Sequence, residues 1–182
     1  MSDQQWIIIR DKGTLRPFNP QLQAFQATED PPRLENHRRL PHPKPWEWEA
    51  QRHVRNLVQQ YKTGDVVLLR LGPERDLYGV AHIRLLSSDS RMVVGLEAIA
   101  VAQHMRGSTP PHIGDELYNY ALDMLDEIIP DEVTQVLLAA MVHVDNRASQ
   151  RMLKRHKFEP AQAASTNMTY EKWTLLWRVG SS

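Results

Sequence analysis

The order of the sequence patterns along this chain predicts a mixed α/β fold. Runs of β-branched and apolar residues, which are typical of strands, alternate with segments in which apolar residues recur at helical spacing. The chain has 182 residues, a length that suits one compact domain with a sizeable core. No internal repeat divides it. We therefore expect a single mixed α/β domain over residues 1–182.

The composition excludes several classes of protein. Hydrophobic residues make up 41% and charged residues 24%, which excludes wholesale disorder. The 22 basic and 22 acidic residues cancel, so neither nucleic acid nor an anionic membrane is expected as a partner. The absence of cysteine excludes disulfides, thiolate zinc sites and cysteine nucleophiles. No apolar run approaches the ~18 residues of a membrane span, and we expect a cytoplasmic protein.

The N-terminal part combines a short strand with a proline-rich arm. The β-branched run at residues 6–10 predicts a first strand. Seven of the 12 prolines fall between Pro17 and Pro45, and no strand or helix period survives at that density. We therefore expect an extended arm or a wrapped loop over about residues 11–45. Beyond it the spacing becomes helical, and one face carries Ala50, Val54, Leu57, Val58 and Tyr61.

The middle and the C-terminal part predict strands that alternate with helices. Residues 65–71 and 77–86 flank a turn and form a hairpin, and residues 92–101 form the next strand. A helical period runs from residue 115 to residue 129 and ends at Pro130. Residues 133–144 predict a long strand whose core, 136–142, lacks alternation, which indicates burial on both faces. Asp145 is a candidate cap for a helix over residues 146–156, and residues 169–179 predict the last strand.

The most informative stretch lies between residues 96 and 115. A strand that ends at Ala100-Val101 leads to Arg106-Gly107, and Ile113-Gly114 then opens a helix. A glycine-containing loop before a helix directs unpaired backbone N–H groups and the positive end of the helix dipole toward an anion. The stretch is therefore either a phosphate site or an ordinary glycine turn before a helix.

A second segment completes the pattern with Asn146, Ser149 and Phe158. Together the two segments resemble the GNAT acyltransferase superfamily. Members of that superfamily carry a strand ending in an Ala-Val pair, a loop R-G-x-G-x-G and a later helix of the form N-x-x-S/A…G-F. The serine form of this helix is most similar to the ribosomal-protein N-terminal acetyltransferases. The resemblance covers roughly residues 65–158.

The resemblance implies a fold and a cosubstrate. The fold would be a mixed central sheet of about six to seven strands flanked by helices, with strands 92–101 and 133–144 splayed around acetyl-coenzyme A. The loop would hold the pyrophosphate, and strand 92–101 would pair with the pantetheine arm. Arg151 or Lys154 would reach the adenosine phosphate, or both would simply face solvent. The residues implied in cofactor binding are Ile99, Val101, Arg106, Gly107, Ser108, Ile113, Gly114, Asp115 and Asn146.

The chain departs from the family pattern in three respects. The loop is longer by three residues, and Pro110 and Pro111 within it offer no N–H to a phosphate. The tyrosine that serves many members as an acid corresponds to Leu153. Lys157 stands where glycine usually ends the helix, which costs roughly 1 kcal/mol if that residue is left-handed.

Glu97 and Ser149 are the candidate catalytic residues. Acyl transfer needs a free amine lone pair, whereas a lysine ammonium has a pKa of about 10.4, so a base must take a proton. Glu97 shares a strand face with Ile99 and Val101 and is the candidate base, although a salt-bridged glutamate would fit the same pattern. Ser149 is the candidate acid for the thiolate. His143 is an alternative base or an ordinary rim histidine.

The sequence thus predicts an N-acetyltransferase that moves an acetyl group from acetyl-coenzyme A to a primary amine by direct attack in a ternary complex. No cysteine is available for a covalent intermediate. The acceptor would be a small-molecule or peptide amine, and a homodimer is compatible with the sequence. The alternative is a non-catalytic acyl-coenzyme A sensor or partner-binding module on the same fold, which Leu153 and the inserted prolines favour.

Two further features have open interpretations. Trp46 and Trp48 would either line the acceptor pocket or pin the arm to the core. The eight histidines contain no HExxH motif and no i, i+4 pair, so no metal site is expected.

Overall fold

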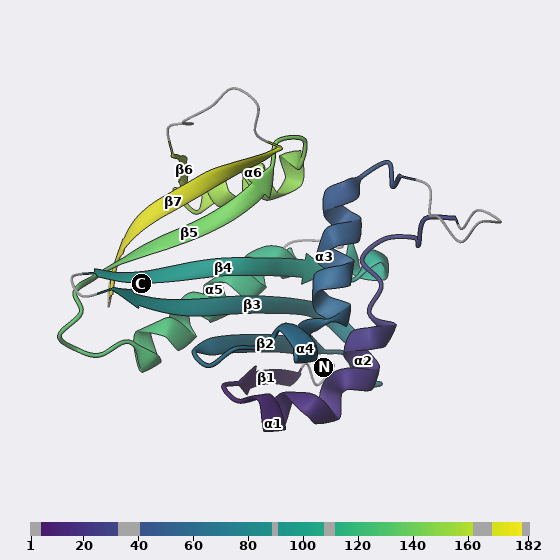
Figure 1. Ribbon diagram of the computed structural model, residues 1–182, viewed down its shortest axis with the longest axis horizontal. Coiled ribbons are helices and arrows are strands. Elements are labelled where there is room, and N and C mark those ends of the chain that lie inside the picture. Colours follow the sequence, from purple (N-terminus) through teal and green to yellow (C-terminus); the bar gives the residue numbers. More distant parts are fainter. Residues whose placement is uncertain (1–4, 33–40, 89–90, 108–111, 162–168, 180–182) are drawn as a thin grey trace.

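The computed structural model describes residues 5–32, 41–88, 91–107, 112–161 and 169–179. These residues form a seven-stranded sheet in the order β1-β2-β3-β4-β5-β7-β6 (Figure 1). Neighbouring strands are antiparallel except β4 and β5, which are parallel. The mixed sheet that the sequence predicts is confirmed. The strands are β1 (Gln5–Ile9), β2 (Asp65–Leu71), β3 (Leu77–Ser88), β4 (Arg91–Val101), β5 (Gln135–His143), β6 (Glu159–Pro160) and β7 (Tyr170–Arg178).

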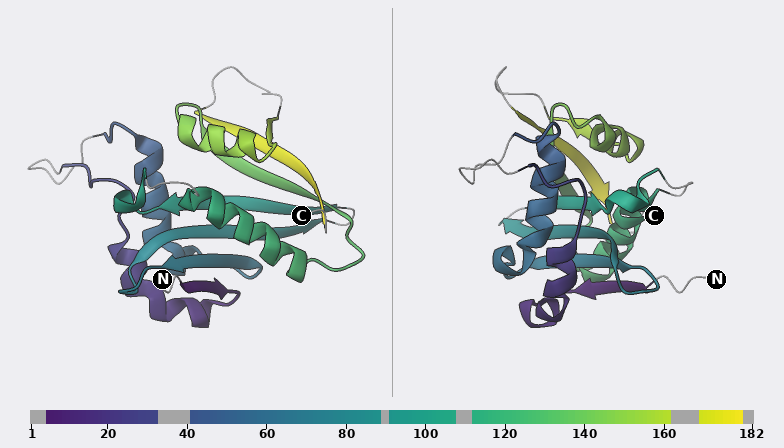
Figure 2. Two further views of the ribbon diagram at one scale, coloured as in Figure 1. Left: turned by 180° about the vertical axis from the view of Figure 1, so that it is seen from behind. Right: turned by 90° about the vertical axis from the view of Figure 1, so that its right-hand side faces the viewer.

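Helices cover both faces of the sheet, as Figure 2 shows from two sides. α5 packs with α6 in one core, and α1 to α4 pack on the opposite face of β2 and β3 in a second core. In the described part of the chain, none of the helices combines the length and the apolar character that a bilayer crossing requires. The helices are α1 (Lys12–Leu15), η1 (Arg16–Phe18), α2 (Asn19–Ala24), α3 (Pro45–Arg55), α4 (Leu57–Gln60), η2 (Gln103–Met105), α5 (Ile113–Ile128) and α6 (Arg147–Arg155).

β2 is the strand that is buried on both faces. Its alternate side chains enter different cores, Val66 and Leu68 toward α5, and Val67 and Leu69 toward α1 to α4. The sequence analysis predicted burial on both faces for residues 136–142 as well, and that prediction is wrong. β5 alternates instead, and Met141 is 58% exposed, because none of the described helices covers the second face of β5 along its whole length.

The proline-rich arm contains helices that the sequence analysis did not expect. Residues 12–24 form α1, η1 and α2, with Pro17 and Pro20 in the first turns of η1 and α2. Proline is tolerated there because the first N–H groups of a helix have no intrahelical partner. Pro45 begins α3 in the same way. Proline therefore marks helix starts in this segment, and the prediction of an arm without helices is wrong for residues 12–24.

The helix predicted around residues 50–61 is divided in two. α3 ends at Arg55 and α4 begins at Leu57, with Asn56 between them in a non-helical conformation. The Asn56 side-chain amide donates to the carbonyl of Arg52 at 2.8 Å. Such local bonds from asparagine compete with the helical ladder, which accounts for the break. A second correction concerns α6, whose cap is Asn146 and not Asp145.

The end of α6 stores backbone strain. Lys157 has a φ of 63°, a left-handed conformation that favours glycine. The N–H of Phe158 donates to the Leu153 carbonyl and that of Lys157 to the Lys154 carbonyl, which is the Schellman arrangement. The sequence analysis expected a strained residue 157 if its backbone is left-handed, and the structure shows that it is.

Replacing Lys157 with glycine is expected to stabilise the fold. The substitution removes the left-handed penalty while the Schellman bonds, which use only backbone atoms, remain. We expect the free energy of unfolding to rise by about 1 kcal/mol in a denaturant titration. Lys157→Ala keeps the strain and should gain nothing. An unchanged or lower stability of Lys157→Gly would show that residue 157 is not strained.

Candidate active site

The two parallel strands at the centre of the sheet separate along their length. Their register pairs end at Leu96 of β4 and Ala140 of β5. β4 continues to Val101 and β5 to His143, and their C-terminal ends diverge (Figure 1). The divergence implied by the family resemblance is confirmed.

Two adjoining pockets lie at this divergence. The first, here called the loop pocket, has a volume of about 480 Å³ and is bordered by Arg106, Gly107 and the start of α5. The second, the histidine pocket, has a volume of about 320 Å³ and is bordered by His53 and His143. The pockets meet, because both are lined by Trp46, Ala50, Ile99, Asn146, Ser149 and Met152.

β4 carries an extra residue at the histidine pocket. Leu96 and Ala98 pair with the consecutive residues Ile83 and His82 of β3, so Glu97 has no partner on β3. One extra residue in one strand is a β-bulge, which bends the strand and redirects its side chains. The bulge lies where the pairing with β5 ends, and it therefore places Glu97 at the pocket.

Beyond the bulge, the outer edge of β4 faces the divergence. The N–H of Ala102 donates to the Tyr78 carbonyl of β3 at 2.9 Å. Because backbone groups of a strand alternate between its two edges, the N–H groups of Ile99 and Val101 point to the opposite edge, toward β5. The structure thus directs toward the pockets the two amides that the family resemblance implied for pantetheine.

The loop pocket is bordered by the N-terminus of a long helix. α5 has 16 residues, and its first backbone bond of the i to i−4 type runs from Glu116 to His112. The N–H groups of Ile113, Gly114 and Asp115 precede that bond and lie at the positive end of the helix dipole. Gly107, on the other side of the pocket, has a φ of 74° and open space where a Cβ would lie. This arrangement suits an anion.

Arg106 is held at the loop pocket by an ion pair. Its guanidinium lies 2.9 Å from the Glu47 carboxylate of α3, which also lies 3.3 Å from the Lys44 ammonium. Burial raises the pKa of Glu47, but the hydrogen bond and charge of Arg106 outweigh it, and the pKa is lowered. Arg106 therefore links the loop to α3 across the pocket. Ser108, also implied in cofactor binding, lies outside the described residues.

Asp115 uses its carboxylate within the protein. Arg155 donates to it at 2.7 Å and His156 lies 2.9 Å from it. Burial opposes ionisation, but these two partners lower the pKa of Asp115. The negative charge of the Asp115 carboxylate is thus balanced by its two partners. The backbone N–H of Asp115 is the group of this residue that could donate to a bound anion. Of the two candidate cations, Arg151 lines the pocket, whereas the Lys154 ammonium lies 5.8 Å from the Trp173 ring centroid.

Asn146 and Ser149 form the N-terminal cap of α6 at the junction of the pockets. Asn146 Oδ1 accepts from the Ser149 N–H at 3.2 Å, and its Nδ2 donates to Ser149 Oγ at 2.8 Å. Removing such a cap typically costs about 1 kcal/mol. Ser149 Oγ accepts this bond and keeps a hydroxyl proton with which it can donate one.

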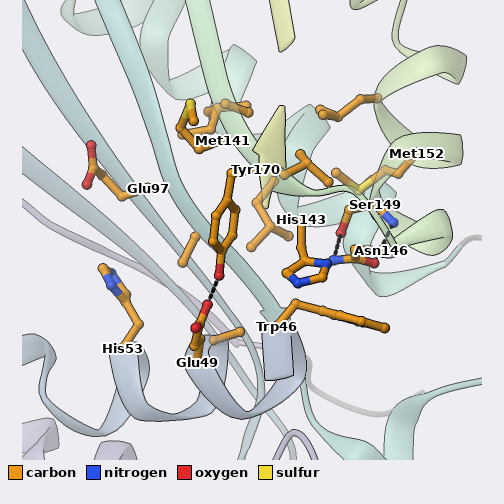
Figure 3. A pocket seen from close by; sticks show the side chains of 17 residues that line it. Trp46, Glu49, His53, Glu97, Met141, His143, Asn146, Ser149, Met152 and Tyr170 are labelled. Atoms are coloured by element: carbon orange, nitrogen blue, oxygen red, sulfur yellow. Dashed lines mark hydrogen bonds between the residues drawn. The ribbon is translucent and has the colours of Figure 1, made fainter. Parts of the chain in front are cut away.

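The histidine pocket is built from α3, β4, β5, α6 and β7 (Figure 3). Trp46, Glu49 and His53 recur at helical spacing and project from one face of α3. The Tyr170 hydroxyl of β7 donates to the Glu49 carboxylate. The His143 ring lies between Trp46 and Tyr170, with ring centroids 4.8 Å and 5.3 Å away. The pocket therefore combines carboxylates with an aromatic wall.

Glu97 lines this pocket, and its carboxylate is ion-paired. Arg84 of β3 lies 3.3 Å from Glu97 and 2.7 Å from Asp65 of β2. The Asp65 side chain is fully buried and also accepts from the N–H of Lys62 at 2.8 Å. The salt-bridged interpretation of Glu97 is therefore confirmed as a contact, and its role as a base stays a prediction.

A chain of three polar side chains reaches the pocket from the core. His53 Nε2 lies 2.8 Å from His82 Nδ1, and His82 Nε2 lies 3.0 Å from Asp65 Oδ2. Burial, with the charges of His82 and Arg84, lowers the pKa of His53 to about 4. Burial also lowers the pKa of His82. Burial alone would raise the pKa of Asp65. The interactions with Arg84, the Lys62 amide and His82 have a larger and opposite effect, so the pKa lies below its ordinary value.

The cofactor-binding residues implied by the resemblance, apart from Ser108, all line the loop pocket, and the two candidate catalytic residues line the histidine pocket. Sequence reasoning missed Glu49, His53 and Tyr170. The i, i+4 spacing of Glu49 and His53 could have indicated a shared helix face, but nothing local points to Tyr170. Trp46 lines both pockets. Trp48 lies beside Arg55, with the guanidinium 5.9 Å from its ring centroid.

No cluster of three or more histidine, aspartate or glutamate side chains suited to a metal ion occurs in the described ranges.

The architecture is the GNAT acetyltransferase fold, as comparison with solved structures shows. No protein-family model and no curated protein sequence matches this chain. A GNAT-family acetyltransferase structure from Desulfovibrio desulfuricans has a TM-score of 0.59 at 12% identity, over 97% of this chain and 99% of that one.

Two further structures of this fold have named substrates or analogues. Arabidopsis thaliana Naa50, in complex with the bisubstrate analogue CoA-Ac-MVNAL, has a TM-score of 0.56 at 16% identity, over 94% of this chain and 97% of that one. A chimera of the spermidine N-acetyltransferase SpeG from Vibrio cholerae has a TM-score of 0.55 at 14% identity, over 96% of each chain.

Proposed function

We propose that this chain is an N-acetyltransferase that moves an acetyl group from acetyl-coenzyme A to a primary amine by direct attack in a ternary complex. One observation carries the proposal: two pockets of opposite chemical character meet where β4 and β5 diverge. The loop pocket offers amide donors and arginines, which suit phosphates. The histidine pocket offers the carboxylates of Glu49 and Glu97, which suit an ammonium. The bisubstrate analogue of Naa50 and the spermidine substrate of SpeG support the same pairing.

The residues of the loop pocket fit acetyl-coenzyme A, which supplies the thioester. The diphosphate would accept from the amides of Gly107 and Gly114, with Arg151 beside the adenosine phosphate. The amides of Ile99 and Val101 would hold the pantetheine arm, and one of them would polarise the thioester carbonyl. A preorganised donor of this kind typically contributes about 2.7–4 kcal/mol to the transition state.

The histidine pocket would hold the acceptor, a small-molecule or peptide amine. Glu49 and Glu97 attract its ammonium, and Trp46 and Tyr170 offer ring faces for cation–π contact. Glu97 would take the ammonium proton and release it to solvent, since its side chain is partly exposed. Ser149 would donate a hydrogen bond from its hydroxyl to the leaving thiolate and so stabilise its charge.

Calorimetric titration with acetyl-coenzyme A, followed by an assay of free-thiol release, tests the proposal. The amine panel would contain spermidine, free lysine and a short peptide with a free α-amine. We expect binding and amine-dependent thiol release. Binding without release would favour the second candidate, an acyl-coenzyme A sensor, which is supported by Leu153, 2% exposed in the core at the position of the family's acid. Absence of binding would contradict both.

Replacing Glu97 with glutamine is expected to lower turnover more at pH 7 than at pH 9. At the higher pH a larger fraction of the amine loses its proton without a base. The glutamine keeps a hydrogen-bonding oxygen near Arg84, so the fold should be retained. The measurement is kcat against pH for both proteins. An equal loss at all pH values, or none, would remove Glu97 from the role of base.

A further inference from the structure

Amine acetylation requires the removal of two protons from nitrogen, and the structure offers a second base for the second proton. We propose that His53 is a catalytic residue whose Nδ1 takes the proton of the nitrogen in the tetrahedral adduct, and that His82 and Asp65 are positioning residues that fix its tautomer. This inference rests on the proposed function. It is carried by the chain of close polar contacts from the Asp65 carboxylate through His82 to His53.

The chain determines which ring nitrogens carry protons. The ionised Asp65 carboxylate can only accept a hydrogen bond, so His82 Nε2, 3.0 Å away, carries a proton. A neutral imidazole has one N–H, and His82 Nδ1 is therefore an acceptor. His53 Nε2, 2.8 Å from it, must donate. His53 consequently keeps a lone pair on Nδ1.

His53 lies in the wall of the histidine pocket, where the acceptor amine would bind. Its ring lines the histidine pocket together with Ile99 and Ser149. Figure 3 shows it projecting from α3 on the side of the pocket where Glu97 lies. Within the described residues no hydrogen bond to His53 Nδ1 is present. His82, which is fully buried, holds the other edge of the ring in place.

The amine, freed of its first proton, forms a C–N bond to the thioester carbon, which leaves a positive nitrogen and an oxyanion. His53 Nδ1 takes one proton from that nitrogen. The oxyanion re-forms the carbonyl, the C–S bond breaks and the thiolate leaves, so the products are an amide, coenzyme A thiolate and protonated His53. His53 then returns its proton to water.

A weak base suits this proton. The adduct nitrogen carries a positive charge beside an electron-poor carbon and is far more acidic than the starting ammonium. Since the pKa of His53 is lowered to about 4, its ring is neutral and ready to accept throughout the neutral range. Removing the proton also prevents reversal, because a protonated amine leaves easily and a neutral one does not. The titratable groups around His53 are Glu49 on α3, Asp65 on β2, His82 and Arg84 on β3, Glu97 on β4, and His143 and Tyr170 at the pocket wall.

Kinetics of His53→Ala and His53→Gln with acetyl-coenzyme A and the most active amine of the panel test the step. We expect kcat to fall by about a hundredfold or more with the KM for acetyl-coenzyme A unchanged. In contrast to Glu97→Gln, the loss should persist at pH 9, because the adduct proton must leave at every pH. Added imidazole should restore part of the rate to His53→Ala. Arg52→Ala, on the exposed side of the same helix, is the matched control and should behave as wild type.

A second measurement does not depend on activity. Long-range ¹H–¹⁵N NMR of the wild-type protein reports which nitrogen of His53 is protonated, and we expect Nε2–H with a bare Nδ1 between pH 6 and 8. An Nδ1–H tautomer, or His53 variants with wild-type kcat, would overturn the inference alone. A loss that disappears at pH 9 would overturn it as well. Absence of turnover by the wild-type protein on every amine would overturn the proposed function together with it.

Discussion

Replacing Gly114 with aspartate is expected to weaken acetyl-coenzyme A binding by about a hundredfold, which corresponds to about 2.8 kcal/mol. Gly114 is the second residue of α5, and a carboxylate there would occupy the helix N-terminus and repel a diphosphate. The fold should accept the side chain, because a Cβ at this position would lie 3.4 Å from Met152 Sδ, an ordinary contact. Calorimetric titration of wild type and variant measures the difference.

Gly114→Ala is the matched control for this experiment. It adds the same Cβ without charge, and we expect its dissociation constant to stay within about threefold of wild type. The aspartate should not lower the unfolding temperature, since an acidic residue in the first turn of a helix is favourable by about 0.3–1 kcal/mol. A stable Gly114→Asp protein that binds acetyl-coenzyme A as tightly as wild type would rule out this helix terminus as the phosphate site.

The second large effect concerns stability. Asp65→Ala is expected to lower the free energy of unfolding by about 3–5 kcal/mol, the usual cost of breaking a buried ion pair. The substitution removes the acceptor for Arg84 at 2.7 Å, for the Lys62 amide at 2.8 Å and for His82 at 3.0 Å. Buried donors then remain without a partner. Denaturant titration at pH 7 measures the loss.

The pH dependence separates this effect from lost packing. The pKa of Asp65 in the folded protein lies below its ordinary value of 3.8, so its contribution is complete above that pH and is lost as the pH falls through the folded value. The difference between wild type and Asp65→Ala should therefore narrow in acid. Asp76→Ala removes a half-exposed carboxylate that lies 3.8 Å from His104, and it should change stability by less than about 1 kcal/mol. Equal losses of stability in Asp65→Ala and Asp76→Ala would contradict the claim that the buried contacts of Asp65 stabilise the fold.

Much of the fold could be predicted from the sequence because its patterns are local. The hairpin of β2 and β3 follows from two apolar runs around a short turn, and α5 follows from its helical period. The N-terminal helices were missed because proline density alone does not distinguish an extended arm from helices that begin with proline. Whether a strand is covered on one face or two depends on helices far away in the sequence, and the burial of residues 136–142 was wrong for this reason.

The candidate site likewise has one part that the sequence predicts and one part that it does not. The loop pocket could be predicted because one part of the sequence supplies much of its wall, from residues 99–107 and 112–115. The histidine pocket is assembled from α3, β4, β5 and β7, and Tyr170 meets Glu49 only after the whole sheet has formed. The chain from Asp65 to His53 likewise depends on how β2, β3 and α3 pack, which no spacing in the sequence encodes.

Titration of ¹⁵N-labelled protein with acetyl-coenzyme A tests the central claim most directly, because backbone amides report where the ligand lies. We expect the largest shifts at Ile99 and Val101 on the free edge of β4, and at Gly107 and Gly114 around the loop pocket. If these four amides keep their positions at millimolar acetyl-coenzyme A, the divergence of β4 and β5 is not an acyl-coenzyme A site.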